Sequence, residues 1–182
     1  MLPTGHIAGG YLVVQTMLAL AHPALSVVEQ QQLLLWGMFF GFAPDLDMFW
    51  VFIKTKRFVA SDEISHREFW SHAPILWFLG GLAVFFFGLM RQNIFIEYLG
   101  IVVWLGSWSH FLFDTIQQGV MWLWPWGRKP LALLDQGVRD NIPLQAFVSY
   151  WIKSVKFYVT RFVVSFVLEL TVITVALLVY FR

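Results

Sequence analysis

The chain has 182 residues, of which 59% are hydrophobic and 13% are charged. Soluble domains carry about 25% charged and about 45–50% apolar residues, so both figures favour an integral membrane protein. The formal net charge of +1 argues against a nucleic-acid partner, which needs a strongly basic surface. Because the chain has no cysteine, disulfides and thiolate ligands are excluded, and any metal must be bound by histidine and carboxylate side chains.

Five apolar segments have the length of about 20 residues that a membrane-spanning helix needs. They cover residues 5–24, 33–53, 73–90, 94–113 and 158–181. The long segment 114–156 is too polar to span but is rich in Trp and Pro, which is typical of chain that lies in the headgroup layer. The sequence therefore predicts an all-α, polytopic membrane protein, with about five apolar helices in a single domain over residues 1–182.

Basic residues gather at one end of the predicted spans. The end that includes the N-terminus holds Lys54, Lys56, Arg57, Arg67, Arg128, Lys129, Arg139, Lys153, Lys156 and Arg161. The opposite end holds Arg91 and Arg182. Since cytoplasmic loops of membrane proteins carry an excess of Lys and Arg, we expect a multi-pass protein of the inner (cytoplasmic) membrane with its N-terminus in the cytoplasm.

Two carboxylates, Asp45 and Asp47, interrupt the apolar run 33–53. A carboxylate at the bilayer centre costs about 2.5–3.5 kcal/mol on insertion scales, so an acid there usually has a partner. Two residues on an α-helix are about 200° apart, so these acids cannot share a helix face. Pro44 disfavours helix at this point. Either the backbone is non-helical after Pro44 and both acids face one centre, or only one of them does.

Most of the histidines and embedded acids fall at the predicted cytoplasmic end of the spans. These residues are His6, Asp45, Asp47, His66, His72, His110 and Asp114. His110 and Asp114 are four residues apart, so they share a helix face and suit a metal site or a histidine with an orienting carboxylate. Taken singly, each residue is also compatible with a helix cap or an interfacial side chain. Glu169 lies deeper in the last apolar segment, and the sequence identifies no partner for it.

Four short motifs follow one another in a fixed order. They are Gly5-His6, Pro44-Asp45-Leu46-Asp47, His66-Arg67 with Ser71-His72, and Ser109-His110 with Asp114. Over about residues 5–135, followed by the C-terminal membrane helix at about 158–181, they resemble the YdjM-like family of LexA-binding, inner-membrane-associated, metal-dependent hydrolases. That family is similar to zinc-dependent phospholipase C, a group of all-helical enzymes that cut phosphate esters with clustered metals.

The resemblance implies a set of metal ligands, namely His6, Asp45, His66, His110 and Asp114. The string from His66 to His72 is one residue longer than the family's usual spacing, so either histidine fits the ligand position; we assign His66 to the metal and His72 to catalysis. The phospholipase C group takes further histidine ligands later in its chain, whereas no histidine follows His110. One or two divalent ions are therefore expected, zinc first, with manganese or magnesium as alternatives.

These features predict a metal-dependent hydrolase of a phosphate ester, lipid or lipid-linked, at the cytoplasmic membrane face. The metal would lower the pKa of a water molecule toward about 7 and polarise the phosphoryl oxygen. Asp47, or Asp45, would act as general base, and Arg67 would clamp the phosphoryl group. The alternatives are a non-catalytic metal-containing membrane adaptor, whose metal site is closed, and an ion or proton-relay transporter, whose acids are spread across the membrane.

Overall fold

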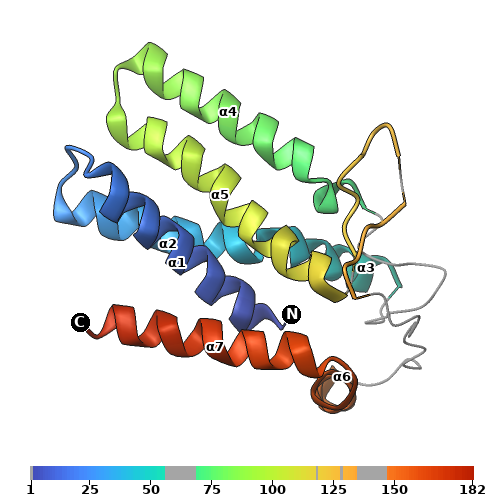
Figure 1. Ribbon diagram of the computed structural model, residues 1–182. Coiled ribbons are helices and arrows are strands. Elements are labelled where there is room, and N and C mark those ends of the chain that lie inside the picture. Colours follow the sequence, from blue (N-terminus) through green and yellow to red (C-terminus); the bar gives the residue numbers. More distant parts are fainter. Residues whose placement is uncertain (1, 56–68, 118, 128, 135–146) are drawn as a thin grey trace.

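The computed structural model describes residues 2–55, 69–117, 119–127, 129–134 and 147–182 (Figure 1). The helices in these ranges are α1 (Pro3–Ala21), α2 (Val27–Phe42), α3 (Asp47–Thr55), α4 (Pro74–Arg91), α5 (Ile94–Gln117), α6 (Phe147–Arg161) and α7 (Val163–Tyr180). Two short 3-10 turns, η1 (Ala43–Leu46) and η3 (Trp70–His72), precede α3 and α4. Within the described residues β pairing is limited to one bridge between Val120 and Leu131, so the predicted all-α class is confirmed.

Three helices, α4, α5 and α7, are long and apolar enough to cross a membrane. The expected number of five is not confirmed. The run 33–53 does not form one long helix, because α2 ends at Phe42 after 16 residues and η1 follows. Helix α1 has 19 residues but carries the polar His6 and Gln15 along its length. The protein therefore has three candidate spans among its described residues, and α1 and α2 pack against them.

The ends of the candidate spans differ in part from the predicted ones. Helices α4 and α5 form a hairpin close to the predicted segments 73–90 and 94–113, but α5 continues to Gln117, which keeps Asp114 inside the helix. The predicted last span, 158–181, is divided at Phe162, whose φ of −104° and ψ of 49° are not helical. Residues 147–161 before this break form α6, a separate helix that the sequence did not predict.

Close helix packing brings the beginning of α1 to the end of α2. A Cβ atom added to Gly10 of α1 would collide with the backbone oxygen of Gly37 of α2, and one added to Gly41 would collide with the backbone oxygen of His6. Small residues at such crossings let two backbones approach each other, as they do in other membrane helix pairs. The crossing therefore sets His6 beside the residues that follow Gly41.

The described core is divided between an apolar end and a polar end. At the end away from the N-terminus, Val14, Leu18, Leu25, Leu33 and Val102 form a buried apolar cluster between α1, α2 and α5. At the other end the buried space is filled by histidine and aspartate side chains. Helix α7 lies alongside α1 and runs in the same direction, so that it also contributes to the polar end (Figure 1).

Candidate metal centre

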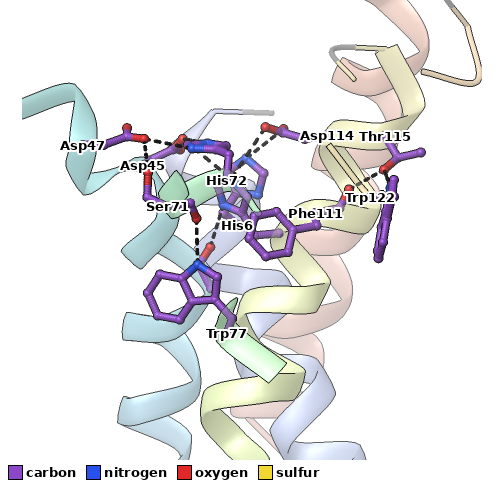
Figure 2. Close-up of polar contacts among 12 residues, drawn as sticks. His6, Asp45, Asp47, Ser71, His72, Trp77, Phe111, Asp114, Thr115 and Trp122 are labelled. Atoms are coloured by element: carbon purple, nitrogen blue, oxygen red, sulfur yellow. Dashed lines mark hydrogen bonds and ion pairs between the residues drawn. The ribbon is translucent and has the colours of Figure 1, made fainter. Parts of the chain in front are cut away.

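The predicted break at Pro44 is confirmed, and it lets both acids reach one imidazole. Residues Ala43–Leu46 form a 3-10 turn, and Asp47 begins α3. The Asp45 Oδ1 atom lies 3.5 Å from His72 Nε2, while Asp47 Oδ2 lies 2.9 Å from His72 Nδ1. Of the two alternatives that the sequence left open, the structure therefore has only Asp45 facing the centre, whereas Asp47 contacts the opposite ring nitrogen of His72 (Figure 2).

Five of the residues that the sequence singled out lie together in the structure. They are His6, Asp45, His72, His110 and Asp114, hereafter the His–Asp cluster. All are buried, and Asp45, at 8% exposure, is the most accessible of them. They come from four separate parts of the chain: the first turn of α1, the turn η1, the turn η3 and the end of α5. The prediction that these segments meet at one end of the bundle agrees with this geometry.

The facing donor atoms of the cluster are separated by distances typical of ligands that share a metal ion. His6 Nε2 lies 3.3 Å from Asp114 Oδ1, and His110 Nε2 lies 3.6 Å from both Asp45 Oδ1 and Asp114 Oδ2. These separations exceed the usual hydrogen-bond length of about 2.9 Å. Two ligands at 2.0–2.2 Å from a tetrahedral ion are about 3.4 Å apart, so the spacing fits a metal of that size.

Two overlapping groups of three residues could hold a divalent ion. One group is His6, Asp45 and His110, and the other is His72, His110 and Asp114; within each, one donor atom per residue lies within 4.8 Å of the others. Imidazole and carboxylate together suit zinc, and they also suit other first-row divalent metals. His110 belongs to both groups and is therefore the central residue of the cluster.

A hydrogen bond to the backbone of α2 fixes the orientation of the His110 ring. Its Nδ1 atom lies 3.0 Å from the carbonyl oxygen of Gly41, an acceptor, so Nδ1 carries the proton and donates it. The other nitrogen, Nε2, then presents a lone pair to the cluster. It is buried and has no hydrogen-bond partner among the described residues. A backbone carbonyl that sets the tautomer in this way is a common companion of histidine ligands in metal sites.

The ring of His72 is fixed by Asp47. The same Asp47 oxygen that faces His72 Nδ1 also accepts a hydrogen bond from the Ser71 hydroxyl, and the Ser71 carbonyl accepts one from the Trp77 indole at 2.7 Å. This carboxylate–histidine pair turns His72 Nε2 toward the cluster. The sequence suggested Asp47 as a general base, whereas its contacts in the structure support a positioning role.

The charges around His72 favour a cation at this place. Burial by itself lowers the pKa of His72, but its hydrogen bonds to Asp45 and Asp47 raise the pKa to about 9. Burial raises the pKa of Asp45, but the neighbouring His110 and the hydrogen bond from His72 outweigh it and hold that pKa well below its usual range. Asp45 is therefore ionised at neutral pH, and the charges that stabilise a proton on His72 would also stabilise a metal ion.

His6 completes the cluster from the side of α1. Its ring stacks on that of His110, with 3.8 Å between the ring centroids and 23° between the planes. Neither ring nitrogen of His6 has a hydrogen-bond partner among the described residues, although Nε2 approaches Asp114. A buried imidazole without such partners is costly unless another group binds it, which again fits a metal ligand.

Glu169 supports the cluster from α7, and the sequence did not reveal this contact. Its carboxylate accepts hydrogen bonds from the Thr4 hydroxyl at 2.8 Å and from the backbone N–H groups of Leu2 and Gly5, each at 3.1 Å. The first N–H groups of a helix lack partners within the helix and attract negative charge. Glu169 therefore caps α1 directly before His6. A pair separated by more than 160 residues leaves no local pattern in one sequence.

The structure does not describe all of the predicted site residues. His66 and Arg67 lie outside the described residues, so their predicted roles as ligand and phosphoryl clamp stay predictions. His22 is exposed at the opposite end of α1, where it caps the C-terminus of that helix.

Comparison with known proteins gives a family for the chain. Neither curated proteins nor solved structures match it. Residues 1–181 match the family described as YdjM inner membrane protein. The match confirms the YdjM resemblance and supports the expected inner-membrane location, whereas the similarity to metal-dependent hydrolases and phospholipase C stays a prediction. Since the match extends over nearly all of the sequence, the chain belongs to the YdjM inner membrane protein family.

Proposed function

We propose that this protein is a membrane-bound, metal-dependent hydrolase that cuts a phosphate ester at the cytoplasmic face of the inner membrane. The observation that carries the proposal is the spacing of the buried donor atoms in the His–Asp cluster, 3.3–3.6 Å apart in three pairs. Zinc is the first choice of ion, because histidine and carboxylate ligands at this spacing suit it, with manganese or magnesium as alternatives.

The residues of the cluster divide into those that bind and those that orient. His6, Asp45, His72, His110 and Asp114 would hold one or two ions. A divalent ion there supplies a Lewis acid, which polarises a phosphoryl oxygen and makes water more acidic. Asp47 and the Gly41 carbonyl keep the imidazoles of His72 and His110 pointing inward. Asp45, ionised and the most accessible member, is the side chain that an incoming water or phosphoryl group meets first.

The surroundings of the cluster support a lipid or lipid-linked substrate. Exposed tryptophans lie in the segments next to it, with Trp50 on α3, Trp70 on η3 and Trp126 in the loop after α5. That loop is tied to α5 by a hydrogen bond of 2.7 Å from the Trp122 indole to the Thr115 hydroxyl. Tryptophan favours the membrane–water interface, where lipid phosphates lie, so the cluster would sit close to the headgroups.

A second candidate function is a non-catalytic metal clip in a membrane adaptor. Burial favours it, because four of the five cluster residues are at most 1% exposed. A structural metal site is fully ligated by protein, whereas a catalytic site keeps one position open. A clip would hold α1, η1, η3 and α5 together without hydrolysing anything.

Hydrolysis by the metal-loaded protein separates the two candidates. The purified protein, loaded with zinc in nanodiscs, would be assayed with a phosphate monoester, a phosphate diester and vesicles of phosphatidic acid. Asp45→Ala and His110→Ala should reduce the rate by about a hundredfold or more, the typical effect of losing one catalytic group. The matched control is His22→Asn, which changes an exposed histidine far from the cluster. His22 has a left-handed backbone conformation, which asparagine also adopts readily.

The possible outcomes assign the function. Hydrolysis by the wild type and by His22→Asn, lost in both cluster variants, supports the hydrolase. Metal-loaded wild type that is inactive on all three substrates, but loses stability when the metal is removed, points to the clip. Equal activity in the wild type and both cluster variants contradicts a catalytic role for the cluster.

A further inference from the structure

We propose that α6 lies in the plane of the membrane surface, at the end of the bundle that holds the His–Asp cluster, and binds anionic lipid headgroups there. This inference goes beyond the proposed hydrolysis and does not depend on it. It rests on the direction of α6, on the distribution of side chains around it, and on its continuity with the apolar surface of α7.

The direction of α6 follows from its junction with α7. Figure 1 shows α6 end-on, whereas α7 runs across the view, so the two helices lie at a steep angle. The chain turns at Phe162, yet hydrogen bonds of 2.9 Å join Phe162 N to Tyr158 O and Phe166 N to Phe162 O. The rings of Tyr158 and Phe166 pack against each other across the turn, with centroids 6.2 Å apart. Because α7 is a candidate span, α6 runs along the membrane surface rather than through it.

Seven described side chains of α6 form three faces. Ile152, Val155 and Val159 are exposed by 65%, 39% and 37% and lie on one stripe at helical spacing. Lys153, Lys156 and Thr160 form a second exposed stripe, about 100° around the axis at 100° per residue. Tyr158 is buried and faces the bundle. A helix at the side of a membrane protein needs these three faces if it lies at the interface: one toward protein, one toward acyl chains and one toward headgroups.

The apolar stripe of α6 is continuous with a lipid-facing surface. Val163, Val164 and Val167, at the beginning of α7, are exposed in the same way. On a membrane-spanning helix such side chains face acyl chains, so the bilayer that covers them also reaches the stripe on α6. The two lysines then lie on the water side of that stripe, at the level of the lipid phosphates. Their positive charge fits an anionic headgroup layer.

The position of α6 also gives the depth of the His–Asp cluster. Glu169 lies seven residues beyond Phe162, a rise of about 10 Å along α7. Since Glu169 caps the first turn of α1, His6 lies at nearly the same depth. The cluster would thus lie just below the headgroups that α6 contacts.

Spin labels on single cysteines test the placement, because the natural chain contains no cysteine. Labels at Ile152→Cys, Val155→Cys and Val159→Cys would be compared with labels at Lys153→Cys, Lys156→Cys and Thr160→Cys in vesicles of phosphatidylethanolamine and phosphatidylglycerol. Collision rates with oxygen report lipid exposure, and those with a water-soluble nickel complex report water exposure. Val167→Cys on α7 and Arg91→Cys at the far end of α4 are the lipid and water references.

The expected result is that the ratio of the oxygen collision rate to the nickel collision rate is several-fold higher at the apolar positions 152, 155 and 159 than at the polar positions 153, 156 and 160. This contrast should be the same at both ends of α6. A ratio that changes steadily along the helix would mean that α6 crosses the membrane, and high nickel exposure at all six positions would mean that it lies in water. Exclusion of both reagents from the first stripe would indicate a protein partner, such as a second copy of the chain. Each of these three results overturns the proposal.

The lipid charge is tested by Lys153→Gln combined with Lys156→Gln, read by the label at Ile152→Cys. In vesicles with phosphatidylglycerol the double variant should move this label toward water, whereas in phosphatidylcholine alone it should have no effect. Lys129→Gln, which removes an exposed lysine outside α6, is the control and should leave the label unmoved. The same label depth in the double variant and its parent in both kinds of vesicle would contradict binding to anionic lipid.

Discussion

At the scale of single residues, the His–Asp cluster depends on groups outside it that form hydrogen bonds with the outward-facing nitrogens of its imidazoles. His110 is oriented by the Gly41 carbonyl and His72 by Asp47. Such partners affect metal affinity without touching the ion, because they fix the tautomer and the direction of each ring. Asp45 and Asp47, only two residues apart, therefore have different roles, which a change at each position can separate.

Asp47→Asn should weaken zinc binding by about 10–100-fold while leaving the number of ions per chain unchanged, which is the usual effect of losing an outer partner. The asparagine can still accept a hydrogen bond from Ser71 but no longer carries the charge opposite His72. Competition with a chelator in detergent measures the affinity. Asp45→Asn is the comparison and should reduce the number of bound ions, and equal effects of the two changes would argue against separate roles.

Glu169→Ala should destabilise the protein, because it leaves the buried Gly5 N–H group, the partly buried Leu2 N–H group and the Thr4 hydroxyl without their acceptor. Hydrogen bonds to a charged group contribute about 1.5–3 kcal/mol each, so we expect the free energy of unfolding to fall by about 2 kcal/mol or more. Glu169→Gln keeps one acceptor oxygen and should be less harmful. Unfolding in detergent, monitored by circular dichroism, measures whether stability falls from the wild type to Glu169→Gln and then to Glu169→Ala. Glu97→Gln, at a less buried acid of α5, is the control, and an unfolding curve for Glu169→Ala that overlays the wild type would refute the cap.

The sequence predicted part of the site at this scale, for identifiable reasons. His110 and Asp114 are one helical turn apart, and Asp45 stands out in an apolar run, so both could be recognised locally. The contact of Glu169 with the first turn of α1 joins residues more than 160 apart, and the hydrogen bond that His110 donates is accepted by the backbone oxygen of Gly41. Neither contact has a pattern that one sequence reveals.

At the scale of helices, the cluster is built by one close crossing and one helix break. The crossing of α1 and α2 depends on the absence of a side chain at Gly10, where the backbone oxygen of Gly37 lies in the way. The break at Pro44 was predictable, because proline disfavours helix in the residue before it. The division of the last predicted span at Phe162 could not be predicted, since neither proline nor glycine occurs between residues 147 and 182.

Gly10→Ala should push α1 away from α2 and lower both stability and metal binding. Forcing an extra methyl group into a packed interface costs about 1–3 kcal/mol. Gly80→Ala on α4 is a matched control, because no atom lies within 4 Å of the added Cβ. It should be neutral or slightly stabilising, since alanine favours helix by up to about 1 kcal/mol over glycine. Thermal unfolding measures the stability of both variants, and zinc titration measures their metal binding. Equal melting temperatures of the two variants would contradict the close packing of α1 on α2 at Gly10.

At the scale of the whole molecule, composition was enough to predict an all-helical membrane protein but not its number of spans. The apolar run 33–53 is long enough to span, but the break at Pro44 divides it between the end of α2, η1 and α3. Three candidate spans remain among the described residues. Multi-pass insertion with a cytoplasmic N-terminus stays a prediction from the distribution of basic residues.

Labelling from outside the cell tests this orientation. Lys129→Cys and Arg91→Cys lie at opposite ends of the bundle, after α5 and at the end of α4. If the basic end is cytoplasmic, a membrane-impermeant maleimide should label Arg91→Cys in intact spheroplasts and Lys129→Cys only after lysis. The reverse pattern would place the His–Asp cluster on the outer side of the membrane.

The central claim is that the His–Asp cluster binds a divalent metal ion, and the metal content of the purified protein tests it most directly. The wild type and His22→Asn, purified without chelators and supplied with zinc, should each retain one or two ions per chain after dialysis. His110→Ala should retain markedly less while keeping its helical circular dichroism, because His110 belongs to both possible ligand groups. A wild-type protein that retains no metal, or a His110→Ala variant that retains as much as the wild type, would contradict the account.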